Sequence, residues 1–291
     1  MVETTVAIPT RVLVFGMAHE DGTLVPAEIH SVAEACGLSV EQVRSCLRRL
    51  TSEGLIVRTG SGADARYAAS EAGMAEIGQS MERTRLAYGQ DAAGRGWDRQ
   101  WRLVGFAVPE RQRAARDAFR DRLRALGGAP VQSGLFVSPH GWHKDVLAEA
   151  DRLDVSDSLT LATTDDLDLG GLRDPRELAR RLWPVDELAR RYQRFADAFA
   201  PLPDVLRDMR RRHERLPDSA FLPGAFRMAV AFQDVFNEDP LLPPELLLRP
   251  WPGRRARELV LTSRRLALTM LERPGRPALF HLFDEALEAL A

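Results

Sequence analysis

Apolar residues recur at helical spacing in a short stretch near the start of the chain. Pro26 suits the first turn of a helix, where its missing N–H is no loss. The apolar positions that follow are spaced i, i+3, i+4 and i+7 and define one face: Ile29, Val32, Ala33 and Cys36. Gly37 can take the left-handed conformation that ends a helix. The pattern therefore predicts a short amphipathic helix that begins at Pro26.

A second helix is predicted directly after this turn. Ser39 is a good N-cap, and Gln42, three residues on, completes a capping box. The apolar face comprises Val40, Val43, Leu47 and Leu50. Gly54 ends the helix. The opposite face is polar and carries Gln42, Arg44, Ser45, Arg48 and Arg49.

A β-hairpin is predicted next. Residues 55–58 read as one strand, residues 59–64 as a turn rich in glycine, and residues 66–69 as the returning strand. Two helices, a tight turn and a hairpin in this order are typical of a winged helix-turn-helix, a DNA-reading module. A generic helical hairpin that exposes its arginines is the alternative.

The rest of the chain predicts two further segments. A leading helix (8–19) and a helix after the hairpin (70–87) complete the first part, and the polar stretch 89–96 reads as a linker. Beyond it, the expected order is strand, helix, strand, helix, strand, a ferredoxin-like pattern: 97–109, 111–126, 130–138, 144–153 and 158–163. From Pro175 on, the pattern is helical: 176–199, 219–236, 254–272 and 278–290.

These elements predict an α+β multidomain protein with three parts. Residues 1–88 form an N-terminal winged helix-turn-helix, residues 97–170 a central ferredoxin-like α+β domain, and residues 175–291 a C-terminal all-α domain. A length of 291 residues is ample for two or three domains.

The charge distribution concentrates DNA-binding potential in one place. The whole chain has a formal net charge of −2, and hence no global basic field. Between Arg44 and Arg66, however, five arginines face two acidic residues, a local net charge of +3. Arginine pairs with phosphates and, bidentately, with guanine in the major groove. We therefore expect seven residues to contact DNA: Gln42, Arg44, Ser45, Arg48, Arg49, Arg58 and Arg66.

The cysteine count and the hydropathy pattern bear on location. Cys36 and Cys46 are the only cysteines, which is too few for a disulfide scaffold and fits a reducing compartment. No stretch reads as a signal peptide or reaches 18 uninterrupted apolar residues. We expect a cytoplasmic protein without a membrane span.

Candidate chemistry is sparse elsewhere. His140 and His143 lie three residues apart, without a third metal ligand at useful spacing. Asp165, Asp166 and Asp168 lack the glycine and the closing glutamate of a calcium loop. No phosphate loop, dinucleotide fingerprint or nucleophile elbow is present. The sequence thus predicts no enzyme, no cofactor and no metal.

The chain resembles the PaaX-type regulators, the phenylacetate-degradation repressor family, nearly from end to end. The resemblance rests on short strings in all three parts: Leu38-Ser39, Val43-Arg44, Arg49-Leu50, Gly54-Leu55, Arg66-Tyr67, Trp97, Trp101, Arg116, Leu123, Leu126-Gly127, Gly134-Leu135-Phe136-Val137-Ser138-Pro139, Leu182-Trp183, Tyr192, Phe195, Arg227, Asp239-Pro240, Leu242-Pro243, Leu247 and Trp251-Pro252-Gly253. It implies a homodimeric repressor that binds double-stranded DNA at a palindromic operator and releases it when an acyl-CoA, such as phenylacetyl-CoA, binds. The family's wing often has a basic tip, whereas residues 60–64 here are nearly neutral.

An effector site is expected where the second and third parts meet. Arg227 and Trp251 are candidates to meet the phosphate and the adenine or aryl group of an acyl-CoA, because arginine and aromatic faces suit these groups. The alternative is structural: Arg227 pairs with Asp239, and Trp251 belongs to the core.

A rival function follows from the central part, which also resembles the small ferredoxin-like nuclease of CRISPR adaptation. That metal-dependent chemistry needs an aspartate at the end of the first strand. Here the strand ends Phe106-Ala107-Val108-Pro109, without a carboxylate. The sequence therefore disfavours a nuclease.

Overall fold

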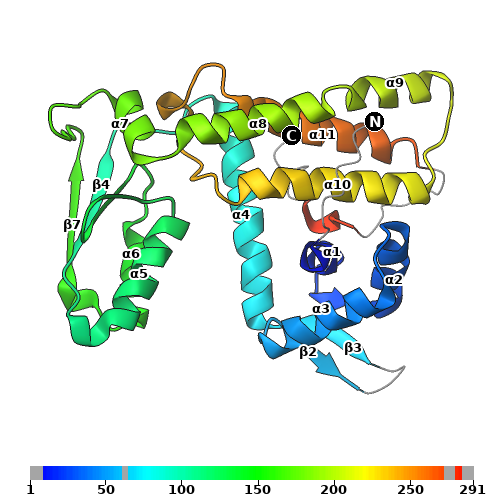
Figure 1. The fold of residues 1–291 in the computed structure, drawn as a ribbon, viewed down its shortest axis with the longest axis horizontal. Helices are drawn as coiled ribbons and strands as arrows, with labels where there is room; N and C mark the ends of the chain where they lie inside the picture. The colour runs from blue at the N-terminus through cyan, green and yellow to red at the C-terminus, as the bar shows by residue number, and fades with distance from the viewer. Residues whose placement is uncertain (1–8, 61–64, 272–278, 284–291) are drawn as a thin grey trace. The chain divides into compact units, whose positions relative to one another are not determined.

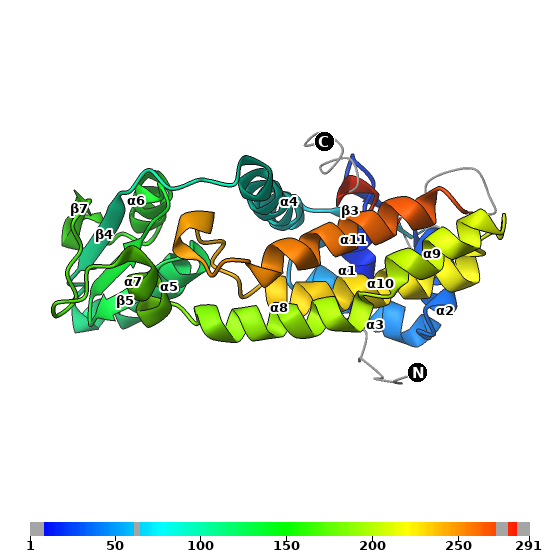
Figure 2. The same ribbon diagram turned by 90° about the horizontal axis from the view of Figure 1, so that it is seen from above.

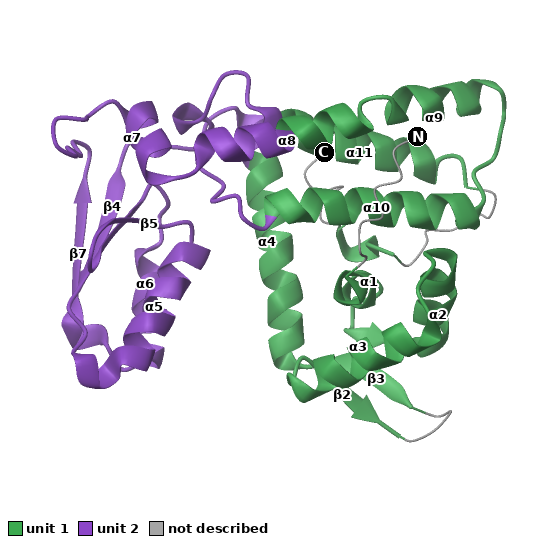
Figure 3. Ribbon diagram, viewed as in Figure 1, with its two compact units in different colours: residues 1–89, 193–236, 254–291 green, residues 90–192, 237–253 purple. Residues whose placement is uncertain are grey.

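The protein, seen here in a computed structural model that describes residues 9–60, 65–271 and 279–283, is an α+β structure with two antiparallel sheets (Figure 1). It divides into two compact units (Figure 3). Unit 1 comprises residues 1–89, 193–236 and 254–291, and unit 2 comprises residues 90–192 and 237–253. The predicted α+β class is confirmed.

Unit 1 begins with the predicted helices and hairpin, together with a strand that was not predicted, β1, and a last helix, α4, that runs on to Ala93 into the predicted linker. Its helices and strands are, in order, α1 (Thr10–Gly16), β1 (Thr23–Leu24), α2 (Pro26–Ala35), α3 (Val40–Ser52), β2 (Ile56–Thr59), β3 (Arg66–Ala69) and α4 (Glu71–Ala93). The three strands form an antiparallel sheet in the order β1-β3-β2. The leading residue of the first predicted helix, Ile8, and the turn 61–64 lie outside the described residues.

The turn between α2 and α3 follows from local chemistry. Gly37 has a φ of +76°, so it supplies the left-handed conformation after α2. The Ser39 hydroxyl accepts a hydrogen bond from the Gln42 N–H at 3.2 Å. In return, the Gln42 side-chain oxygen accepts one from the Ser39 N–H at 2.7 Å. The predicted capping box is confirmed, and it fixes where α3 starts.

The C-terminal helices of unit 1 share one hydrophobic core with α1, α2 and α3. These helices are α9 (Leu202–Arg211), α10 (Asp218–Phe236) and α11 (Pro252–Leu268), the last from residue 254 on. Phe221, Leu222, Phe226 and Val230 of α10 lie in the same buried cluster as Ile29, Val32 and Ala33 of α2. The predicted boundaries 1–88, 97–170 and 175–291 stay a prediction, but residues 193–236 and 254–271 do not build a core apart from the first helices.

Unit 2 is built on a four-stranded sheet. Along the chain its elements are β4 (Trp101–Phe106), α5 (Arg113–Ala125), β5 (Ala129–Gln132), β6 (Leu135–Ser138), α6 (His143–Arg152) and β7 (Leu159–Thr164), followed by α7 (Pro175–Leu182). Helix α8 (Val185–Phe199) starts in unit 2 and continues into unit 1. The strand order is β5-β6-β4-β7, with every neighbouring pair antiparallel.

The single strand predicted over 130–138 is wrong. The structure divides it into β5 and β6, which form a hairpin around Gly134. Gly134 has a φ of +74°, and a Cβ there would lie 2.6 Å from the Phe106 carbonyl oxygen. Only glycine fits this turn without strain.

The single helix predicted over 176–199 is also wrong, because α7 ends at Leu182 and α8 starts at Val185. Pro184 lies between them and has no N–H to continue the helix. The last predicted helix, 278–290, falls mostly outside the described residues, which include only 279–283 of it.

Both faces of the four-stranded sheet are covered. On one face, Val104 and Phe136 pack with the inward residues of α5 and α6, among them Phe119, Leu123 and Val146. On the other, Trp101 stacks on Trp183 with a centroid distance of 6.3 Å, beside Leu178 of α7. The Trp183 indole N–H donates to the Gly127 carbonyl at 3.0 Å.

Candidate nucleic-acid interface

Helix α3 separates a buried face from a polar one. Val43, Cys46, Leu47 and Leu50 are buried in the core of unit 1. The five predicted DNA-contacting residues of α3 are all exposed: Gln42, Arg44, Ser45, Arg48 and Arg49. Arg58 of β2 and Arg66 of β3 are exposed as well. The structure thus presents all seven side chains at the surface of one unit.

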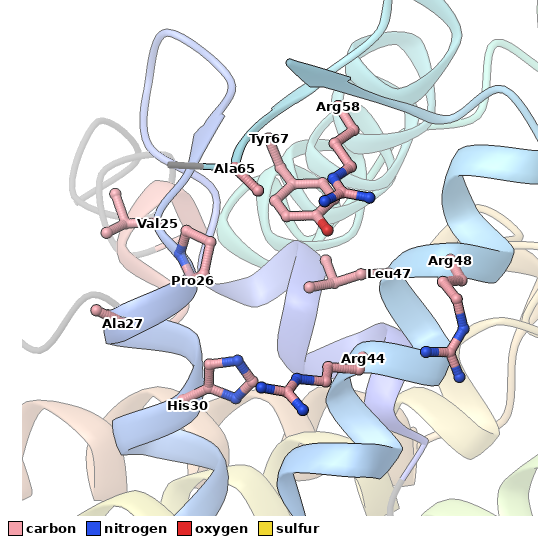
Figure 4. A pocket seen from close by; sticks show the side chains of 10 residues that line it. All are labelled: Val25, Pro26, Ala27, His30, Arg44, Leu47, Arg48, Arg58, Ala65 and Tyr67. Carbon is pink, nitrogen blue, oxygen red and sulfur yellow. The ribbon is translucent and has the colours of Figure 1, made fainter. Parts of the chain in front are cut away.

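Several of these side chains surround a pocket of about 480 Å³ (Figure 4). Three elements line it: the start of α2, the exposed side of α3, and the β2–β3 hairpin. The lining residues are Val25, Pro26, Ala27, His30, Arg44, Leu47, Arg48, Arg58, Ala65 and Tyr67. None of these ten residues is acidic, although the Arg48 guanidinium pairs with Glu41, which lies outside the lining.

His30 is the residue of this pocket that the sequence reasoning missed. It lies one turn into α2, and its ring points toward the Arg44 side chain across the gap between α2 and α3 (Figure 4). Its Nδ1 atom is buried without a hydrogen-bond partner among the described residues. The sequence offered one signal for His30: it follows Pro26 by four residues, so both lie on the same face at the start of the predicted helix.

The arginines differ in their ion pairs. Arg48 lies 3.0 Å from Glu41, its neighbour two turns earlier on α3, and both side chains are well exposed. Arg49 lies 3.9 Å from Glu53. Arg44, Arg58 and Arg66 form no ion pair with any residue that the structure describes. They are therefore the cations of this surface that are already available to an anion.

Gln42 is predicted both to complete the capping box and to contact DNA, and the structure shows the capping box. Its amide oxygen is engaged by the Ser39 N–H in the capping box. Only the amide NH₂ group remains available as a donor. A contact between Gln42 and DNA stays a prediction.

The two predicted effector residues lie in different units. Arg227 is exposed on α10 of unit 1 and has no ion-pair partner among the described residues. Trp251 of unit 2 is half-buried and packs edge-to-face on Tyr192, with the ring centroids 5.8 Å apart. Asp239, the alternative partner of Arg227, is buried and accepts hydrogen bonds from the Tyr192 hydroxyl at 2.7 Å and the Leu241 N–H at 2.8 Å. The effector site stays a prediction.

Several of the histidines and aspartates singled out in unit 2 have structural partners, whereas His143 Nε2 is buried without a hydrogen-bond partner among the described residues. His140 Nε2 lies 3.0 Å from the Pro240 carbonyl oxygen. Burial lowers the pKa of His143, and the neighbouring Arg102 guanidinium lowers it further. Asp168 accepts from the Gly171 N–H and from Arg173, which hold its pKa below the ordinary value. Within the described ranges, no three metal-ligating side chains gather.

No helix within residues 9–60, 65–271 and 279–283 combines the length and the apolar character that a bilayer crossing needs.

Comparison with known proteins decides the family. Residues 94–179 match the model of the PaaX protein central Cas2-like domain, and residues 183–270 match that of the PaaX-like protein C-terminal domain. The chain belongs to the PaaX-type family. The transcriptional repressor PaaX of Escherichia coli (strain K12) is 25% identical to this family member over 246 residues, which is 84% of this chain and 74% of that protein.

A solved structure supports the fold alone. The uncharacterized protein Rv0674 from Mycobacterium tuberculosis superimposes with a TM-score of 0.51 at 18% sequence identity, over 96% of this PaaX-type chain and 95% of that one.

Proposed function

We propose that this PaaX-type protein is a ligand-responsive, DNA-binding transcriptional repressor of a catabolic operon. The observation that carries the proposal is the acid-free pocket with Arg44, Arg48 and Arg58 on the exposed side of α3. A surface on which arginines outnumber carboxylates favours the phosphate backbone of nucleic acid. The E. coli relative, a transcriptional repressor, supports the same function.

The proposed modules follow from the order of elements. Helices α2 and α3 with the β2–β3 hairpin act as a winged helix-turn-helix, in which α3 enters the major groove. In unit 2, the order β4-α5-β5-β6-α6-β7 with the strand order β5-β6-β4-β7 supports a ferredoxin-like domain. The helices from residue 175 on form the helical C-terminal part.

Within this module some exposed side chains contact the phosphate backbone and others contact base edges. Arg44 and Arg58, unpaired in the pocket beside the first turn of α2, hold a backbone phosphate, since a helix N-terminus and guanidinium groups both favour anions. Arg48 and Arg49 read base edges. Gln42, Ser45 and Arg66 add contacts around them.

Arg48 must leave Glu41 before it can read a base. An exposed ion pair is worth about 0–1 kcal/mol, and a bidentate arginine–guanine pair about 1–3 kcal/mol of discrimination. The exchange is therefore favourable at a matching base and close to neutral at a wrong one. Glu41 thus lowers the net gain from Arg48 at a matching base by about 0–1 kcal/mol.

Regulation would act through the shared core of unit 1. Because α10 packs against α2, a ligand that shifts the C-terminal helices also shifts the DNA-reading helices. The effector is an acyl-CoA of the phenylacetyl-CoA type, with Arg227 and Trp251 as candidate contacts. The active form is a homodimer on a palindromic operator, with its two α3 helices roughly 34–36 Å apart.

The test is a gel shift with a duplex selected from a random pool by the wild-type protein. Arg48→Ala should weaken binding to that duplex by about 1–3 kcal/mol and leave the melting temperature unchanged, because Arg48 is exposed. Unchanged affinity would reject α3 as the reading helix. The rival nuclease function is tested in the same tubes: with magnesium or manganese added, we expect no cleavage, and cleaved DNA would favour the nuclease.

A further inference from the structure

The two edges of the sheet in unit 2 differ in a way that matters for association. The β5 edge is short and interrupted: it has four residues, contains Pro130, and shifts register between Pro130 and Gln132. Proline and bulges are devices by which proteins prevent an exposed edge from pairing with another strand. This edge is protected.

The opposite edge, β7, carries none of these devices. It pairs with β4 over its full six residues, from Leu159 opposite Phe106 to Thr164 opposite Trp101, without a break in register. Its sequence, Leu-Thr-Leu-Ala-Thr-Thr, has no charge, no proline and no glycine. Thr160, Ala162 and Thr163 are exposed, and no strand of the described chain pairs with its outer side. Both views of the fold show β7 at the margin of the sheet (Figures 1 and 2).

We propose that the free edge of β7 pairs antiparallel with β7 of a second copy of this chain. The sheet of unit 2 then continues across a two-fold axis into the sheet of the partner. Antiparallel pairing of two identical strands is self-complementary, so one surface serves both copies and the assembly closes as a dimer. The inference rests on the proposed function in one respect, because it names the surface of the proposed homodimer.

The side chains next to β7 fit a second copy better than a charged peptide. A six-residue strand pair spans only about 20 Å, whereas stable interfaces bury about 1,200–2,000 Å² in total. Helix α6 packs through Val146 and Ala150 in the same cluster as Leu159 and Leu161 of β7. On α6, Leu147 is 43% exposed, a large apolar side chain that the partner's α6 can cover across the axis.

The charges beyond the strand are compensated in part. Asp166, which follows β7, is neutralised by Arg173 at 3.2 Å, and Asp168 is held by the same guanidinium at 2.9 Å. Asp165, directly after β7, is exposed and forms no ion pair with a described residue, so added salt should strengthen the pairing by screening this carboxylate.

The test is the dimer dissociation constant of the full chain, measured by sedimentation velocity. Lysine on an edge strand is a natural block to pairing, so Thr160→Lys/Ala162→Lys should raise the dissociation constant at least ten-fold. Gln132→Lys, an exposed position on the protected edge, is the matched control and should change nothing. The circular dichroism of each variant checks that the monomer stays folded.

Cross-linking gives a second readout, in which the expected result is the gain of a covalent dimer and not a loss of dimer affinity. The variant Thr160→Cys/Ala162→Cys should form a covalent dimer on mild oxidation, because strand pairing about a two-fold axis places these positions opposite each other. Gln132→Cys should not. The native thiols give little background: Cys36 and Cys46 are buried, and burial raises the pKa of Cys36 to about 11.

The outcomes separate the inference from the function on which it rests. If the wild type is a dimer, the lysine variant has the same dissociation constant and the cysteine variant gives no cross-link, the β7 assignment is overturned and the homodimer stays in place. A wild-type monomer at micromolar concentration, on DNA as well as free, would overturn both.

Discussion

The salt dependence of DNA binding tests the division of work among the arginines. A side chain that neutralises one phosphate contributes about 0.9 to the slope of log K against log salt on any duplex. A contact to a base edge instead raises the affinity for the operator sequence alone. Arg44 and Arg58 lie unpaired in the acid-free pocket. Arg44→Ala and Arg58→Ala should therefore each lower the slope by about 0.9 on any duplex.

The magnitude follows from the same relation. Between 50 and 200 mM salt the concentration rises four-fold, so one phosphate contact accounts for a factor of about 3.5 in affinity over this range. Fluorescence anisotropy with an unselected duplex of about 30 base pairs resolves this difference, and no operator is needed. Arg210→Ala provides the matched control, because Arg210 is exposed on α9 and makes no ion pair with the described residues.

Two results would refute the reasoning. If Arg44→Ala and Arg58→Ala leave the slope unchanged, the pocket does not hold a phosphate. If Arg48→Ala lowers the slope on the unselected duplex as much as they do, the proposed separation of phosphate contacts from base contacts is wrong.

Three further predictions concern stability and the effector. Gly73→Ala should destabilise the protein by about 1–3 kcal/mol in a urea melt, because its Cβ would lie 2.1 Å from the Leu55 carbonyl oxygen; Gly78→Ala on the same helix meets nothing within 4 Å and should be neutral or stabilising. Ser39→Ala should cost about 1 kcal/mol in the same melt through the lost capping box, and a loss near zero would show that the box does not stabilise α3. In a thermal-shift panel of acyl-CoA thioesters at least one should raise the melting temperature, and a panel without effect would reject the CoA effector.

Local chemistry made part of the fold predictable from the sequence. The helix that starts at Pro26, the capping box of Ser39 and Gln42, and the exposed face of α3 depend on residues within a turn or two of each other. The missed β5–β6 turn has a different cause. Ser133-Gly134 is a turn signal that the strand prediction passed over, whereas the approach of Gly134 to the Phe106 carbonyl joins residues distant in sequence.

The features that involve distant residues could not be predicted. The shared core of α2 and α10 joins positions about 190 residues apart, so it is visible only once the chain is folded. The same holds for the pocket, in which His30, Arg44 and Arg58 come from three separate elements. The pairing of Arg48 with Glu41 is closer in sequence, but one face of a helix offers each arginine several partners.

The most direct test of the central claim is selection of DNA by the full-length protein from a random duplex pool, followed by sequencing. The account predicts enrichment of a palindrome whose half-sites lie one helical turn, about 10–10.5 base pairs, apart or a multiple of it. A pool that shows no enriched sequence after repeated rounds at low salt, with the protein folded, would contradict it.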